Sequence, residues 1–70
     1  MKENIINKVY EFRIRKGVTQ ENIAAEIGVS RQTIIAIEKG NYTPSITLAL
    51  KLACFFDVPV EKIFKISYEK

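Results

Sequence analysis

The sequence predicts an all-α domain of five short helices with an extended segment at each end. Apolar residues recur at helical spacing along most of the 70-residue chain, and glycine, serine and threonine interrupt that spacing where helices end and begin. The composition, with 47% hydrophobic and 27% charged residues, is ordinary for a globular protein and excludes wholesale disorder or a fibrous chain. At this length we expect a single domain, residues 1–70.

The first helix is predicted from Asn7 to Lys16. Val9, Phe12 and Lys16 mark one stripe along it at helical spacing. Gly17 ends this helix, because glycine readily adopts the conformation that follows a last helical turn. Residues 4–7 are also compatible with an extended segment.

The second helix begins after Thr19, which is a good N-cap. Ile23, Ala24 and Ile27 give the helix an apolar face, and Gly28 ends it after only about nine residues. The small side chain of Ala24 lets another helix cross closely, and Gly28 can take the left-handed conformation of a tight turn.

Ser30 caps a third helix immediately after this turn. Ile34 and Ile37 point inward and anchor the helix against the second one, and Gly40 ends it. The other face carries Arg31, Gln32, Ile35, Ala36 and Lys39. A helix that is anchored in this way and presents such side chains outward fits the major groove of DNA.

Residues 40–44 form a turn-rich loop, after which Ser45 caps a strongly apolar fourth helix. We expect this helix to be the spine of the core. Its apolar residues are Ile46, Leu48, Ala49, Leu50, Leu52, Ala53 and Phe56. Pro59 suits the first position of a short fifth helix, residues 60–64, and residues 65–68 alternate as a strand does.

The composition also excludes several classes of function. With Cys54 as the single cysteine no intrachain disulfide forms, and without histidine the usual zinc ligands and the commonest general base are missing. We therefore expect no metal, no cofactor and no hydrolytic triad. The sequence lacks an apolar run of about 18 residues to span a membrane and the apolar segment of a signal peptide, which predicts a reduced, cytoplasmic protein. Cys54 is either a redox sensor or an inert, partly exposed residue, and its apolar helix favours the second interpretation.

The segment from Thr19 to Glu38, with two short helices around a glycine turn, resembles the helix-turn-helix of the phage-repressor and Cro-type family. The resemblance covers residues 8–64, the core of the domain. It rests on residues at the family's spacings: Arg13, Thr19, Gln20, Ala24, Gly28, Val29, Ser30, Ile34, Ile37, Glu38, Gly40, Pro44 and the segment from Val58 to Phe64. It implies a compact five-helix lambda-repressor-like fold.

Two further features look like the small dimeric cytolysin-repressor-type regulators. They are the phrase Ser-Arg-Gln-Thr-Ile, residues 30–34, and the Pro44-Ser45 junction. In that branch the terminal segments pair as a small antiparallel sheet. The resemblance therefore implies strands in residues 3–7 and 65–69 that also contribute to dimer contacts.

The resemblance also implies roles for individual residues. Arg31 and Gln32 stand where family members touch base edges, since arginine can fork onto guanine and glutamine can pair with adenine. Positions that typically hold phosphates carry Thr19, Gln20, Ser30, Lys39, Asn41 and Thr43. Arg13 and Glu38 are expected to form a structural ion pair between the first and third helices.

Other positions admit two interpretations. Ile35 stands where the family often has asparagine. It either contacts a thymine methyl group, as Ala36 can, or packs beside the loop at Tyr42. Apolar residues near the C-terminus either pack within one monomer or form a dimer interface, and we expect the interface because a domain this small has few ways to cover them. These residues are Phe55, Ile66 and Tyr68.

We therefore predict a transcriptional regulator that binds double-stranded operator DNA as a homodimer, within the nucleoid, and represses by occluding a promoter. The formal net charge of +3, about +6 for a dimer, is compatible with such a polyanion. The alternative is an antitoxin or adaptor that uses the fold to bind a protein, although an added tail usually supplies that surface. An enzyme is disfavoured, because Glu21 and Glu26 do not share a helix face and no nucleophile with a base is present.

Overall fold

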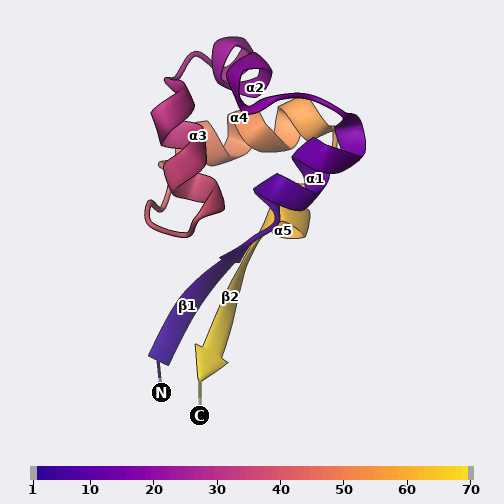
Figure 1. Ribbon diagram of the computed structural model, residues 1–70. Helices are drawn as coiled ribbons and strands as arrows, with labels where there is room; N and C mark the ends of the chain where they lie inside the picture. The colour runs from indigo at the N-terminus through magenta and orange to yellow at the C-terminus, as the bar shows by residue number, and fades with distance from the viewer. Residues whose placement is uncertain (1, 70) are drawn as a thin grey trace.

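Figure 1 shows the computed structural model of the chain, which describes the backbone of residues 2–69 and the side chains of residues 4–68. Five helices pack together, and two strands project from them as a ribbon. In chain order the elements are β1 (Lys2–Asn7), α1 (Val9–Lys16), α2 (Gln20–Ile27), α3 (Arg31–Glu38), α4 (Ile46–Phe56), α5 (Val60–Ile63) and β2 (Phe64–Glu69). The predicted fold class is confirmed, including the small sheet.

Side-chain caps begin three of the helices, as the sequence predicts. The Thr19 hydroxyl accepts a hydrogen bond from the Asn22 amide (3.0 Å), and Asn22 Oδ1 accepts one from the Thr19 amide (3.4 Å), which closes a capping box on α2. Ser30 and Ser45 cap α3 and α4, each through a 3.2 Å bond from the amide three residues on. Because each cap satisfies an amide that the first turn leaves without a partner, local sequence sets these helix starts.

The first two helices end at glycines in the left-handed conformation, Gly17 with φ 76° and Gly28 with φ 86°. A residue with a β-carbon is strained there. α3 ends at Glu38, and Gly40, with φ 80°, turns the chain two residues later. α4 ends at Phe56, and the next residue, Asp57, is left-handed with φ 57°, which was not expected from the sequence.

Two predicted helix boundaries are wrong, one start and one end. Asn7 belongs to β1, and α1 begins at Val9, two residues later than predicted. The Asn7 side chain donates to the Ile37 carbonyl (3.0 Å) and accepts from the Val9 amide (3.4 Å), so a contact with α3 decides where the strand ends. The fifth helix, α5, begins at Val60 as its predicted range requires, with Pro59 as the N-cap residue and not in the first helical position. It ends one residue earlier than predicted, at Ile63, because Phe64 already belongs to β2.

The core lies between the helices and is built from all five of them. Its most deeply buried apolar side chains are Val9, Ile23, Ile34, Ile37, Leu52 and Ile63. α4 forms the expected spine with one side only: Leu52 is fully buried, but Ile46 is 80% exposed and Leu50 is 54% exposed. This helix is therefore apolar on its outer side as well.

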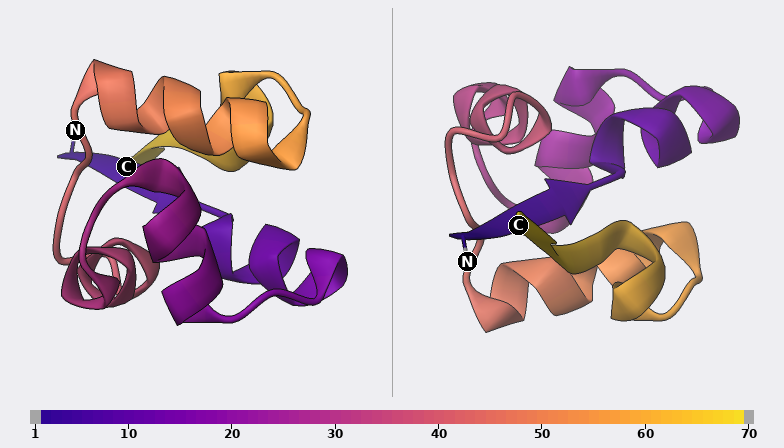
Figure 2. Two further views of the ribbon diagram at one scale, coloured as in Figure 1. Left: turned by 90° about the horizontal axis from the view of Figure 1, so that it is seen from above. Right: turned by 90° about the horizontal axis from the view of Figure 1, so that it is seen from below.

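The ribbon pairs β1 with β2 in antiparallel register, with Asn7 opposite Phe64 and Ile5 opposite Ile66. Since alternate residues face opposite sides, Ile5, Ile66 and Tyr68 share one side with Phe64. Phe64 packs against the core, but the other three side chains lie farther out and are about half exposed. Figure 1 shows the ribbon extending away from the helices, and in the views of Figure 2, along its length, it projects between α4 on one side and α1 and α3 on the other. One side of the ribbon thus continues the core outward without a cover.

Candidate nucleic-acid interface

α2, the turn after it and α3 form a helix-turn-helix. The amides of Gly28 and Val29 both donate to the Ala24 carbonyl at 2.9 Å, so the chain leaves α2 through a tight, hydrogen-bonded turn. Ile34 and Ile37 of α3 are completely buried. The opposite side of α3 therefore remains at the surface in a fixed orientation.

The four predicted base-contact residues divide into two pairs. Arg31 and Gln32, in the first turn of α3, are exposed, whereas Ile35 and Ala36, one turn later, are half-buried. Ala36 lines a shallow hollow together with Gln32, Thr33, Asn41 and Tyr42. The geometry presents the polar pair to a ligand more fully than the apolar pair.

The predicted phosphate contacts come from two places on the surface. Thr19 and Ser30 are exposed helix caps, and the lone pairs of their hydroxyl groups accept amide hydrogens. The segment after α3 contributes the exposed residues Lys39, Asn41 and Thr43. Gln20 differs from the other five because it is half-buried and its amide nitrogen donates to Glu38.

Arg13 and Glu38 form an ion pair between α1 and α3. Arg13 Nε donates to Glu38 Oε2 at 2.7 Å and Nη2 donates to Oε1 at 3.3 Å, while Nη1 donates to the Val18 carbonyl at 3.0 Å. The exposed fractions of the two side chains are only 11% and 7%. A pair this buried is strongly destabilised if either partner is removed, because the other charge is then stranded.

Gln20 adds α2 to this pair through a 3.1 Å bond from its Nε2 to Glu38 Oε1. The sequence did not predict this contact, because the two residues lie 18 positions apart and no local pattern connects them. Glu38 of α3 thereby connects the two helices of the motif with α1.

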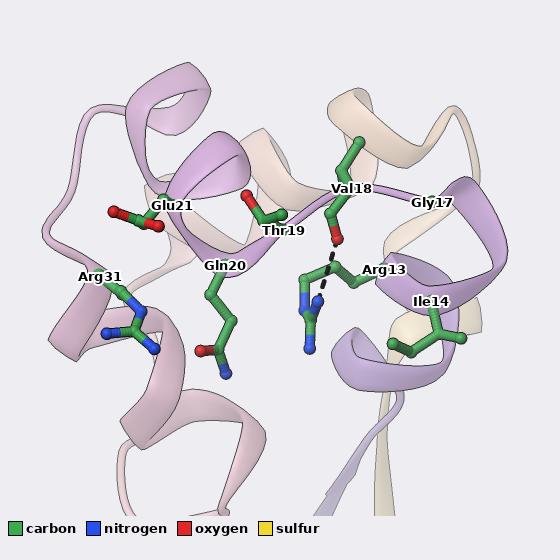
Figure 3. A pocket seen from close by; sticks show the side chains of 8 residues that line it. All are labelled: Arg13, Ile14, Gly17, Val18, Thr19, Gln20, Glu21 and Arg31. Carbon is green, nitrogen blue, oxygen red and sulfur yellow. Dashed lines mark hydrogen bonds between the residues drawn. The ribbon is translucent and has the colours of Figure 1, made fainter.

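A hollow opens beside this network between α1, α2 and α3 (Figure 3). The residues that line it are Arg13, Ile14, Gly17, Val18, Thr19, Gln20, Glu21 and Arg31. In Figure 3 the Gln20 side chain extends between those of Arg31 and Arg13, and Glu21 lies on the same side of the hollow as Arg31. A candidate base-reading arginine and a polar side chain of α2 therefore share one recess.

The three residues expected in a dimer interface lie in two different surroundings. Ile66 and Tyr68 are on the uncovered side of the ribbon. Phe55 is half-buried at the end of α4, where its ring packs edge-on against Phe56 and lies 5.0 Å from the Lys16 ammonium group. The structure does not bring Phe55 together with the other two.

Features relevant to other functions are few in the described part of the chain. Cys54 is an exposed free thiol at the edge of a shallow hollow. Among residues 2–69, no helix combines the length and the apolar character that crossing a membrane requires. The described side chains also include no cluster of histidine, cysteine, aspartate and glutamate that would suit a metal ion.

Comparisons with known proteins identify what the chain is similar to. A protein family described as Helix-turn-helix matches residues 9–63. An uncharacterized HTH-type transcriptional regulator of Methanocaldococcus jannaschii is 57% identical over 58 residues, which cover 83% of this chain and 88% of that protein. The cryptic phage CTXphi transcriptional repressor RstR of Vibrio cholerae is 35% identical over 57 residues, 81% of this chain and 51% of the repressor. The crystal structure of the restriction-modification controller protein C.AhdI from Aeromonas hydrophila matches with a TM-score of 0.72 and 31% identity over 77% of this chain and 82% of that one.

Proposed function

The chain belongs to this helix-turn-helix family, and we propose that it is a sequence-specific DNA-binding regulator of transcription that acts as a homodimer. The predicted resemblance to phage repressors agrees with the match to RstR. The observation that carries the proposal is the first turn of α3, where Arg31 and Gln32 are exposed above a buried isoleucine anchor. The names of the relatives also indicate a regulator and not an enzyme.

α3 is the recognition helix in this proposal and enters the major groove with its N-terminal turn first. Arg31 donates two hydrogen bonds to O6 and N7 of a guanine, and Gln32 pairs with N6 and N7 of an adenine. Each such pair discriminates against a wrong base by roughly 1–3 kcal/mol. Ile35 and Ala36 lie one turn farther along, where a thymine methyl group is the apolar feature that they can contact.

Phosphate contacts on both sides of α3 set the register of the helix. The caps Thr19 and Ser30 present hydroxyl groups, and Gln20 lies in the first turn of α2. Lys39, Asn41 and Thr43 extend the contacts past the end of α3. These groups fix position and orientation and carry no sequence information directly.

A homodimer places two recognition helices in successive major grooves, which requires half-sites about 10 bp apart in a pseudo-palindrome. The uncovered side of the ribbon supports this proposal, because an isolated two-stranded ribbon is at best marginally stable in water. Ile66 and Tyr68 on that side are the interface residues that the geometry favours. Occlusion of a promoter in the cytoplasm, on the nucleoid, is the proposed mode of action, and the name of RstR as a transcriptional repressor supports repression.

The test is selection of bound duplexes from a randomised DNA pool, followed by titration of the selected duplex at two salt concentrations. We expect a pseudo-palindrome that binds far more tightly than bulk DNA. Arg31→Ala loses this preference, and Lys39→Ala weakens binding to all sequences and lowers the salt slope by about 1. Enrichment of no sequence, or binding that is indifferent to Arg31, would contradict the proposal and favour the protein-binding adaptor.

A further inference from the structure

A hollow distinct from the recess of Figure 3 lies where α1 and α4 end. It has a volume of about 300 Å³ and is lined by Phe12, Arg15, Lys16, Phe56 and Val58, and we call it the α1–α4 hollow. Both charged residues in this lining are cations, and the other three residues are apolar. In Figures 1 and 2 the last turns of α1 and α4 lie on the opposite side of the bundle from α3.

The two cations of this hollow lie over aromatic rings. The guanidinium carbon of Arg15 is 5.2 Å from the centroid of the Phe12 ring, and Lys16 Nζ is 5.0 Å from that of Phe55. A ring face attracts a cation and orders it, but it does not neutralise the charge as a carboxylate does. Among the side chains that the structure describes, the only ion pair is the one at Glu38. The hollow therefore combines an apolar wall with two ordered positive charges that no carboxylate of the described chain balances.

The aromatic surface continues into a neighbouring hollow. The ring centroids of Phe55 and Phe56 are 5.2 Å apart, and each ring lines one of the two hollows. The second one, which we call the Cys54 hollow, also contains Lys51 and Glu26, whose opposite charges balance. Both hollows are open to solvent, whereas a small-molecule site encloses most of the surface of its ligand. This shape favours an extended protein segment over a free small molecule.

We propose that the two hollows together bind an acidic segment of another protein, in which a bulky apolar residue is flanked by aspartate or glutamate. The apolar side chain packs against Phe12 and Phe56, and the carboxylates accept hydrogen bonds from Arg15 and Lys16. Such charge-assisted bonds are about twice as strong as neutral ones. The rest of the segment crosses the Phe55 ring into the Cys54 hollow. This inference goes beyond the proposed function and does not depend on DNA binding.

The location of the hollows leaves them accessible when DNA is bound. The recess of Figure 3 is bordered by Arg13 and Ile14 of α1, whereas the α1–α4 hollow uses Phe12, Arg15 and Lys16. At about 3.6 residues per turn these two groups lie on different sides of α1. The linings of both hollows come from α1, α2, α4 and the segment after α4, whereas base contacts and the second copy are assigned to α3 and the ribbon. One molecule can therefore hold an operator and an acidic partner at the same time.

The test is selection from a displayed library of random peptides, followed by titration of the full chain against a labelled selected peptide by fluorescence anisotropy. We expect enriched peptides in which an apolar residue stands beside aspartate or glutamate. Arg15→Gln and Lys16→Gln should each weaken binding roughly twofold to fivefold, and less at high salt. Enrichment of no peptide, or of peptides without carboxylates, would overturn the proposal.

Lys62→Gln is the matched control. It removes the same charge from the exposed surface of α5 and touches neither hollow, so it should leave peptide binding unchanged. A loss equal to that of Lys16→Gln would show attraction to net charge alone and would overturn the proposal. The exposed thiol of Cys54 gives a second readout. Saturating peptide should slow its reaction with a maleimide, and an unchanged rate would contradict the path across Phe55.

Operator DNA is the other anion that these cations could bind, and its salt slope separates the two. Arg15→Gln and Lys16→Gln should bind the selected operator with the slope of the wild type. A lower slope together with unchanged peptide binding would overturn the proposal and assign both cations to phosphates. Arg31→Ala should lose the operator preference and still bind the peptide, so a failure of the proposed function can be distinguished from a failure of this one.

Discussion

The helix bundle and the ribbon differ in how much of their apolar surface is covered by the chain itself. In the bundle, isoleucine and leucine side chains are fully buried, serine and threonine cap three helices, and the buried Arg13 is paired with Glu38 at 2.7 Å. In the ribbon, two strands pair with each other, but Ile66 and Tyr68 each remain 54% exposed on the side that continues the core. The bundle is complete within one chain, whereas the ribbon has an apolar side that its own chain does not cover.

The difference suggests a division of roles. The residues that we assign to DNA all belong to the bundle or its loops, and the residues that we assign to a second copy and that lie together belong to the ribbon. Stability of the bundle should then depend on internal contacts, and that of the ribbon on protein concentration.

The largest expected effect is on the ion pair of the bundle. Glu38→Ala leaves Arg13 buried without a partner and should lower the free energy of unfolding by about 3–5 kcal/mol, measured by urea denaturation. The double variant Arg13→Met, Glu38→Leu strands no charge and should lose much less. If Glu38→Ala is as stable as the wild type, the bundle tolerates an unpaired cation, and its stability does not depend on this internal ion pair.

Next in size is the contrast between a core leucine and a ribbon isoleucine. Leu52→Ala should cost about 2–5 kcal/mol at every protein concentration, because it leaves a cavity in the bundle. Ile66→Ala should have little effect in dilute protein and should weaken self-association in sedimentation equilibrium. Equal losses from both variants at all concentrations would mean that the ribbon belongs to the core of the monomer.

A smaller effect is expected at the start of α4. Ser45→Ala removes the hydroxyl that accepts the Leu48 amide and should cost about 1 kcal/mol in thermal or urea unfolding. Ser67→Ala in β2 is a matched control that caps no helix and should change stability by no more than about 0.5 kcal/mol. If the two serine variants lose the same stability, the cap does not explain where α4 begins.

The smallest effect on stability is expected at Ile46, which is 80% exposed. Ile46→Glu should change the free energy of unfolding by no more than about 0.5 kcal/mol, since a carboxylate is also favourable in the first turn of a helix. Sedimentation equilibrium of this variant tests whether the outer side of α4 also takes part in self-association. Loss of self-association equal to that of the Ile66 variant would assign the outer side of α4 to the same interface as the ribbon.

Local signals in the sequence predicted most of the fold. Caps such as Thr19 and turn glycines such as Gly28 act within a few residues, so their effect on helix boundaries can be read from the chain itself. The boundary at Asn7 depends on a carbonyl of α3, 30 residues away, and no local pattern could reveal it. For the same reason the apolar pattern of α4 could not show which of its sides, that of Leu52 or that of Ile46, is covered.

The candidate site was predictable to a similar degree. The outward face of α3 followed from the spacing of its isoleucines, and the pairing of Arg13 with Glu38 from the resemblance to a family. The third member of that network, Gln20, is known only from the structure, because its partner is fixed by how α2 and α3 cross. The resemblance placed Gln20 among the phosphate contacts and did not indicate its bond to Glu38.

The register of the ribbon also affects the order in which parts of the chain fold. β1 and β2 join residues at the two ends of the described chain, so closing the ribbon encloses the whole bundle in one loop. Closing so long a loop carries a large entropic cost unless other contacts have already brought its ends together. During synthesis β1 leaves the ribosome first and has no strand to pair with until β2 follows all five helices. We therefore expect α3, the proposed recognition helix, to be folded before the ribbon forms, so that the proposed pairing with a second copy becomes possible only after α3 is in place.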